Sequence, residues 1–185
     1  MKMNMRTALF AFLFAVAPAA PSRAARAPSP GKTFSAASFE CPIPAAWASR
    51  GKGEEAVLTG PAGGGPIAAR IWIRRVPPDH PLYPTAAAYV ERHARTPDVQ
   101  SPGWTVGKPE KIRVAGREAE RLVNDTSEFV PPSSTDAKEV PLREEHVAVP
   151  AAKGFYVLVY SAPRPLFEKN RAAFAQVLAG FKPKP

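Results

Sequence analysis

The stretch Gly154-Phe-Tyr-Val-Leu-Val-Tyr-Ser-Ala162 decides the fold. Residues 155–161 are almost all apolar or aromatic, and successive side chains of a β-strand point to opposite faces of the sheet. A strand that is apolar on both faces is covered on both sides. The stretch therefore predicts a central strand that lies between two layers.

A helix is predicted directly after this strand. Pro165 suits the first turn of a helix, where its missing N–H costs nothing, and Gly180 suits the end of one. Between them, large apolar side chains recur at helical spacing. They are Leu166, Phe167, Phe174, Val177, Leu178 and Phe181.

The remaining chain supplies more strands and one more helix. Alternation and hairpin spacing predict strands at residues 34–43, 56–59, 67–76, 104–114, 118–129 and 142–149. Thr85 is a suitable N-cap for a helix that ends near Arg95. The proline-rich segment Val130–Pro141 is predicted to be a long loop of unknown role. The sequence thus predicts an α+β fold, in which helices flank an antiparallel sheet of about six or seven strands as an α/β/α sandwich.

These elements, in this order, carry residues that resemble the Mog1/PsbP-like fold over roughly 34–183. The first strand leads through prolines to a tryptophan, the middle helix carries a tyrosine, and the last strand and helix complete the pattern. The residues are Phe39, Pro42, Pro44, Trp47, Thr85, Tyr89, the hairpin Ile112–Ala119, Gly154–Ala162, Phe167, Phe174 and Gly180–Pro183. The loops at 63–65 and 130–141 have no counterpart in it.

The resemblance implies a binding or assembly module. Members of this superfamily include an extrinsic photosystem subunit, a Ran-binding nuclear protein, secretion chaperones and secreted bacterial proteins of unknown role. The bacterial secreted group is the best match to this chain. A shared fold does not transfer a function, so the activity has to be argued from the residues.

The amino-terminal residues indicate export. Lys2 and Arg6 precede the apolar run Ala8–Ala17, and Ser22-Arg23-Ala24 offers a small-residue cleavage site. This is the pattern of a secretory signal peptide over residues 1–24, followed by a disordered spacer at 25–33 and a single domain at 34–183. We expect a periplasmic or extracellular protein. The apolar run is too short to span a bilayer, which takes roughly 20 residues, and no later stretch is longer.

The chain is basic, with a formal net charge of +9 over 185 residues. Only three of the 25 basic residues, and none of the 16 acidic ones, lie before residue 25, so the charge survives cleavage. A basic surface can attract nucleic acid or anionic envelope polymers. The basic residues are scattered, however, and no RNA-binding motif is present, so nucleic acid is not expected as a partner.

The single cysteine, Cys41, cannot form an intramolecular disulfide. It is in phase with Phe39 and Ile43 on the first predicted strand. We therefore expect a small buried apolar side chain and not a reactive thiol, because no basic group nearby would lower its pKa.

Arg70, Trp72 and Arg74 share one face of the strand at 67–76 and form the first candidate site. Cations beside an aromatic ring could bind an acidic protein partner or a sugar polymer. The alternative is that Trp72 packs beneath a second layer, with the arginine stems beside it.

Glu144 and His146 are two residues apart, so their side chains share a face of the strand at 142–149. With further ligands from elsewhere, such as His93 or His80, they could hold a metal ion. The alternative is a solvated face of an edge strand, which often carries charge.

No catalytic motif was found. The three histidines lie in no nucleophile or zinc-protease pattern, and no phosphate-binding loop is complete. We therefore expect no enzymatic activity and no cofactor. The sequence favours an exported, non-enzymatic binding module for an envelope protein, with a small-ligand or metal carrier as the alternative. It leaves the oligomeric state open.

Overall fold

The computed structural model describes residues 31–61, 63–96 and 103–184. These residues contain an eight-stranded sheet, a three-stranded sheet and two α-helices. In chain order the elements are β1 (Thr33–Ser35), β2 (Phe39–Pro42), β3 (Ala48–Arg50), β4 (Glu55–Thr59), β5 (Arg70–Val76), α1 (Ala86–His93), β6 (Thr105–Val106), β7 (Glu110–Val114), β8 (Arg117–Val130), β9 (Lys138–Pro150), β10 (Phe155–Pro163), α2 (Arg164–Gly180) and β11 (Lys182–Pro183).

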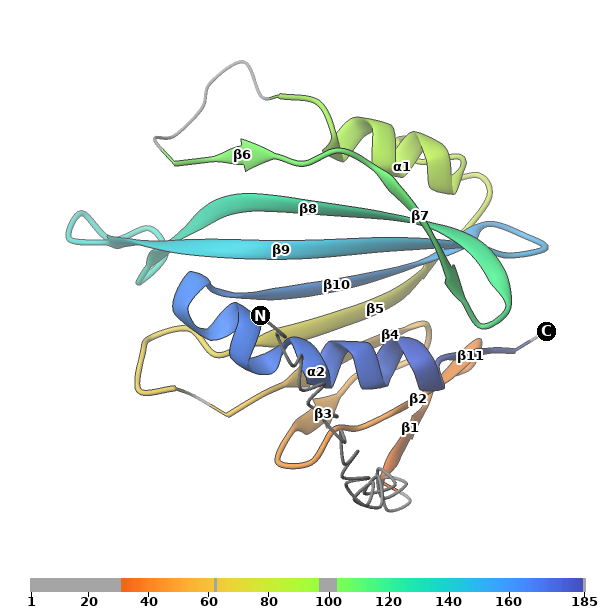
Figure 1. Ribbon diagram of the computed structural model, residues 1–185, viewed down its shortest axis with the longest axis horizontal. Coiled ribbons are helices and arrows are strands. Elements are labelled where there is room, and N and C mark those ends of the chain that lie inside the picture. Colours follow the sequence, from red (N-terminus) through yellow and green to blue (C-terminus); the bar gives the residue numbers. More distant parts are fainter. Residues whose placement is uncertain (1–30, 62, 97–102, 185) are drawn as a thin grey trace, which may run out of the picture.

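β10 lies at the centre of the large sheet, as the sequence predicts. The strand order is β3-β4-β5-β10-β9-β8-β6, and β7 pairs with β8 (Figure 1). Every pairing is antiparallel. β10 joins two halves that are far apart in sequence, because β5 pairs with one of its edges and β9 with the other.

The two faces of β10 belong to two separate apolar cores. Tyr156 and Leu158 pack in the larger core together with Phe174 of α2. Phe155 and Val157 pack in the smaller core beneath α1. The helices therefore cover opposite faces of the sheet, and the predicted α+β sandwich is confirmed.

The helix ends follow the sequence signals. The Thr85 side chain accepts a hydrogen bond from the Ala88 N–H at 3.1 Å, so it caps α1. α2 begins with Pro165 in its first turn and ends at Gly180. A Cβ atom at Gly180 would collide with the Pro42 ring, so the helix end fits closely against β2.

The prediction of one strand at residues 34–43 was wrong. β1 and β2 are separate strands that form a hairpin, with residues 36–38 between them. β11 at the chain end pairs with β2 and completes the three-stranded sheet. Pairing between the two ends of the domain is a long-range event that local alternation does not show.

The predicted loop at Val130–Pro141 is shorter in the structure, because both of its ends belong to strands. β8 and β9 pair in register from Glu120 with Ala148 to Val130 with Lys138, which leaves only residues 131–137 as the connection. Prolines are disfavoured in strands because they lack an N–H, and this argued for a loop. Pro141 nevertheless lies within β9, opposite Ser127.

The large sheet also exceeds the predicted six or seven strands. β3 and β6 contain three and two residues, too few for alternation to be recognised. The segment predicted as one strand at 104–114 is divided into β6 and β7.

Cys41 is fully buried in the larger core, as expected. Burial raises the pKa of its thiol to about 12, so the reactive thiolate is scarce at neutral pH. Cys41 therefore serves as a packing residue.

Two predictions about the ends of the chain are only partly covered by the structure. The predicted signal peptide at 1–24 and most of the spacer at 25–33 lie outside the described residues. β1 begins at Thr33, one residue before the predicted start of the domain. Neither helix of the described chain combines the length and apolar character needed to cross a membrane.

The turn between β9 and β10 depends on a glycine. Gly154 has φ +72°, and an added Cβ would collide with the Val76 carbonyl oxygen. Gly116 has a similar φ of +74° with nothing within 4 Å of such a Cβ. Gly154→Ala and Gly116→Ala should both lose about 1 kcal/mol from the left-handed backbone. Gly154→Ala should lose a further ~1–3 kcal/mol because the neighbouring strand must shift.

Urea unfolding of the two variants measures this difference in the free energy of unfolding. Equal losses would show that the β9–β10 turn does not lie against β5 as described.

Candidate functional site

One row of side chains crosses the large sheet on the face that carries α1. The strand registers align Val57 of β4 with Trp72 of β5, Trp72 with Val159 of β10, and Val159 with His146 of β9. Directly paired residues in an antiparallel sheet point to the same face. Trp72 is 43% exposed, whereas His146 is 6% exposed. The row therefore runs from an open half of the face to a half that α1 covers.

The open half contains a shallow pocket of about 370 Å³. Its apolar part consists of Val57, Trp72 and Val159, and its polar part includes Arg70 and Glu144. Trp72 is one of the three large apolar side chains that remain exposed in the described chain. The alternative that Trp72 packs beneath a second layer is therefore wrong, because α1 covers the Val76 end of β5 and leaves Trp72 open.

The two arginines of the predicted site are both engaged within the chain. Arg70 forms an ion pair with Glu128 of β8 at 3.1 Å, and both side chains are about two-fifths exposed. The Arg74 guanidinium lies over the Trp72 ring, 5.2 Å from its centroid. The predicted Arg70, Trp72 and Arg74 surface thus exists, but the cation of Arg70 is already neutralised.

A buried hydrogen-bonded chain lies beneath α1. The Tyr89 hydroxyl is 2.8 Å from Nδ1 of His146, and Nε2 of His146 is 3.3 Å from the Glu144 carboxylate. Burial raises the pKa of Tyr89 far above its usual value, so the phenol keeps its proton. Both contacts are satisfied when Tyr89 donates to Nδ1 and Nε2–H donates to Glu144.

The alternative of a solvated edge strand for Glu144 and His146 is wrong, because β9 lies inside the sheet between β8 and β10. The metal hypothesis also gains no support. Both ring nitrogens of His146 face protein partners. Glu145 points to the other face, where it pairs with Arg121 and Arg171. Within residues 31–61, 63–96 and 103–184, no group of three His, Cys, Asp or Glu side chains could hold a metal ion.

The electrostatics of this cluster follow from burial and from its internal contacts. Burial alone would raise the pKa of the Glu144 carboxyl, but the hydrogen bond from His146 holds that pKa below its usual value. Burial lowers the pKa of His93, and the nearby His146 lowers it further. The rings of His93 and His146 are 5.1 Å apart.

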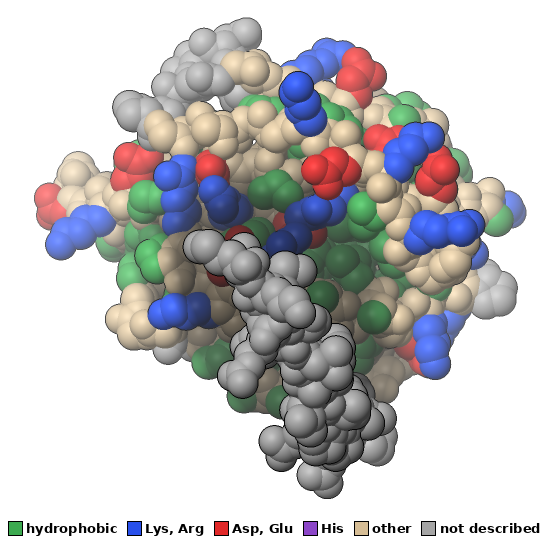
Figure 2. Space-filling model, in the orientation of Figure 1, with side chains coloured by type: hydrophobic (Ala, Val, Ile, Leu, Met, Phe, Trp, Pro, Cys, Tyr) green, Lys and Arg blue, Asp and Glu red, His purple; other side chains and the backbone are tan. Residues whose placement is uncertain are grey.

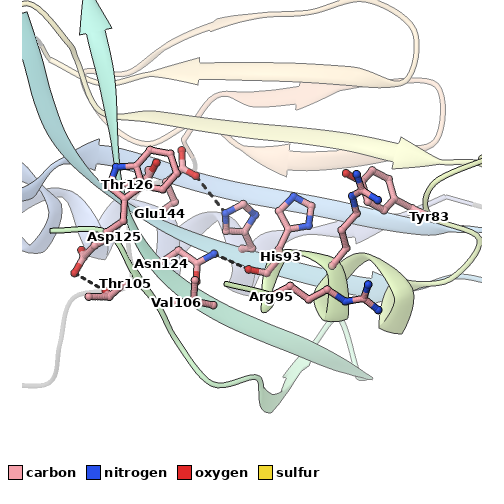
Figure 3. Close-up of a pocket in the computed structure, with 12 residues that line it drawn as sticks. Tyr83, His93, Arg95, Thr105, Val106, Asn124, Asp125, Thr126 and Glu144 are labelled. Carbon is pink, nitrogen blue, oxygen red and sulfur yellow. Dashed lines mark hydrogen bonds and ion pairs between the residues drawn. The ribbon is translucent and has the colours of Figure 1, made fainter. Parts of the chain in front are cut away.

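A second pocket, of about 260 Å³, lies at the C-terminal end of α1 (Figure 3). In Figure 3, Tyr83 lies at one end and Asp125 and Thr105 at the other, with His93 between them. Its other lining residues are Arg92, Arg95, Trp104, Val106, Asn124, Thr126, Glu144 and His146.

Asn124 frames this second pocket. Its Nδ2 donates to the His93 carbonyl at 3.1 Å, and its Oδ1 accepts from the Gly107 N–H at 3.1 Å. The end of α1 and the segment after β6 are thereby both attached to β8. Glu144 lines this pocket as well as the open one, so the two pockets are neighbours.

The structure therefore brings the two predicted sites together on one face of the sheet. Sequence reasoning missed Tyr89 and Glu128, the partners of His146 and Arg70. It treated Tyr89 only as a packing residue on the helix. The pairing register of β8, β9 and β10 brings these partners together, and local sequence spacing does not show it.

Charge is mixed on one face of the molecule. Figure 2 shows Lys and Arg side chains spread over this face, with Asp and Glu among them. On this face the charges do not form the concentrated basic stripe of a nucleic-acid interface.

Comparisons with known proteins identify the fold. No protein-family model and no curated protein sequence matches the chain. Among solved structures, PA94 of Pseudomonas aeruginosa, a protein of unknown function, is similar, with 18% identity, TM-score 0.54, and 83% of this chain and 97% of that chain covered. LpqN of Mycobacterium tuberculosis, involved in cell envelope biogenesis, has 14% identity, TM-score 0.54, and coverage of 85% and 87%.

PsbP of the cyanobacterium Synechocystis is also similar, with 13% identity, TM-score 0.50, and coverage of 88% of this chain and 98% of that chain. The predicted Mog1/PsbP-like fold is thus confirmed. Identities this low establish the fold and leave the function to be argued from the site.

The buried chain makes a prediction about stability. Tyr89→Phe removes the hydroxyl that satisfies His146 Nδ1, so the free energy of unfolding should fall by about 1–3 kcal/mol. Tyr83→Phe is the matched control, because the Tyr83 hydroxyl makes no hydrogen bond to the described part of the chain. It should cost less than about 0.5 kcal/mol. Equal effects in urea unfolding would show that the Tyr89 and His146 contact is not formed.

His93 makes a prediction about pH. Its pKa is lower in the folded chain than in the unfolded chain, so the unfolded state binds more protons around and below about pH 6.5. The folded state should therefore lose stability as the pH falls from about 7 to about 5. In His93→Gln this loss should be smaller, as measured by urea unfolding at each pH. A steeper loss in the variant would contradict the lowered pKa.

Proposed function

We propose that the protein is an exported, non-enzymatic binding module that captures an envelope protein on the open half of its sheet. The binding surface consists of Arg70, Trp72 and Arg74, together with Val57 and Val159. The connection at residues 131–137 follows the strand that carries Glu128, a lining residue of the open pocket, and is proposed as a further contact.

The exposure of Trp72 supports this proposal most directly. Trp72 is 43% exposed and lies between Val57 and Val159, so it is part of a contiguous apolar patch, and such patches mark interaction sites. Trp and Arg are the residues that most often dominate the affinity of protein interfaces. The neighbouring Val57 and Val159 are only partly buried and extend the apolar area around the indole.

The charges nearby indicate the kind of partner surface. Glu128 neutralises Arg70, and Glu55 of β4 lies in register with Arg74. The surface is therefore an apolar centre with charged residues around it, of which Arg70 is ion-paired, and this resembles an ordinary protein interface. A strongly acidic partner, one of the options left by the sequence, is not required.

The hydrogen bonds of the imidazoles support a non-enzymatic role. In the described part of the chain, His146 bonds to Tyr89 and Glu144, and His93 bonds to the Tyr89 carbonyl. His80 accepts from the backbone N–H groups of Leu82 and Tyr83. Among residues 31–61, 63–96 and 103–184, no imidazole hydrogen-bonds to a serine, threonine or cysteine that it could activate as a nucleophile.

Export is supported by the pattern at residues 1–24. The similar fold of LpqN, a protein involved in cell envelope biogenesis, agrees with a role in that compartment. A single domain with an exposed aromatic patch suits an adaptor within an envelope assembly.

The test is a crosslinking pull-down from envelope extract with the mature protein, followed by mass spectrometry. We expect one strongly enriched protein that is lost with Trp72→Ala. Leu82→Ala is the matched control, because Leu82 is also an exposed apolar residue, 54% exposed, but does not line the open pocket.

Titration calorimetry with the purified partner should then show at least a tenfold weaker affinity for Trp72→Ala, which corresponds to about 1.4 kcal/mol. Equal capture by the Trp72→Ala and Leu82→Ala variants would overturn this surface as the binding site.

A further inference from the structure

The pocket at the C-terminal end of α1 has features that the proposed protein-binding function does not use. Its floor contains His146, which is 6% exposed and held by hydrogen bonds on both ring nitrogens. Buried polar side chains lower the stability of a protein unless all of their hydrogen bonds are formed. An apolar side chain at this position would carry no such cost. A polar floor inside a cavity is typical of a ligand site.

Most charges around this pocket are paired within the protein. Glu144 contacts His146, and Asp125 is held by Arg143 at 2.8 Å. Arg95 pairs with Glu91 at 2.6 Å. Asp125 is therefore paired with a cation, and the Glu144 carboxylate is held by a hydrogen bond from His146, so both carboxylates of the lining are engaged within the protein.

Arg92 is the exception. Its guanidinium lies 6.0 Å from the centroid of the Tyr83 ring, and no carboxylate of the described residues lies within ion-pairing distance. A guanidinium presents a planar set of donors that matches a carboxylate in two parallel hydrogen bonds. The positive charge of Arg92 therefore favours an anionic ligand in this pocket.

The apolar walls of the pocket favour an organic anion over an inorganic one. Tyr83, Trp104 and Val106 supply apolar surface, and the pocket of about 260 Å³ is smaller than a typical drug-sized site. An inorganic ion such as phosphate would leave the aromatic walls uncovered. We propose that this pocket binds a small organic carboxylate, with its carboxylate on Arg92 and its apolar body against Tyr83.

His93 is placed to respond to such a ligand. The groups that face its ring are the Tyr89 carbonyl, the Tyr83 ring, the His146 imidazole, the Glu144 carboxylate and the adjacent Arg92. A bound carboxylate adds negative charge beside an imidazole that is otherwise disfavoured from protonation. Binding should therefore be accompanied by proton uptake, and the affinity should rise as the pH falls from about 8 to about 6.

The test is calorimetric titration of the purified protein with phenylacetate, benzoate and isovalerate. Phenylacetamide is the matched neutral probe, and inorganic phosphate is the probe without an apolar body. We expect saturable binding of at least one carboxylate, and binding of the amide that is at least about tenfold weaker.

Arg92→Gln should weaken carboxylate binding by about 10- to 100-fold. Lys169→Gln removes the same charge from an exposed position on α2, on the opposite face of the sheet, and should leave binding unchanged. In His93→Gln, the rise in affinity towards low pH should disappear.

The proposal is overturned if none of the three carboxylates binds at millimolar concentration, if the amide binds as tightly as the acid, or if Arg92→Gln binds like the unaltered protein. Because Arg92 does not line the open pocket around Trp72, these outcomes do not depend on the capture of a protein partner.

Discussion

The burial of β10 on both faces is the constraint on which the rest of the structure depends. Tyr156, Leu158 and Tyr160 need a cover on one face, and Phe155 and Val157 need one on the other. α2 has 17 residues and spans about 25 Å, whereas α1 has eight residues and spans only about 12 Å. Seven strands side by side are about 29 Å wide, so α1 leaves much of its face open.

This unequal cover accounts for both pockets. Where α1 ends, polar side chains of β8 and β9 line a small cavity, and beyond it Trp72 lies on an uncovered strand. Tyr89 and His146 attach the helix to the sheet through a hydrogen bond, which specifies its position more narrowly than apolar contact does. Glu144 borders both pockets, so the two lie side by side on this face of the sheet.

The sequence predicts the layers better than the edges and the site. Apolar residues at 155–161 were sufficient for the central strand and the fold class, whereas the alternation around Trp72 left open whether its side chain is exposed or covered. The break between β1 and β2 and the pairing of Pro141 inside β9 depend on distant strands, so local propensity misplaced them. The link between Tyr89 and His146 spans 57 residues, and no local spacing reveals it.

The central claim is that the uncovered half of the sheet is the surface that meets the partner. Site-specific photocrosslinking in living cells tests it most directly, with a photoreactive side chain placed at Val57 beside Trp72, and at Lys169 on the opposite face. The account predicts an adduct with one envelope protein from position 57 and none from position 169. An adduct from position 169 alone, or from neither position, would contradict it.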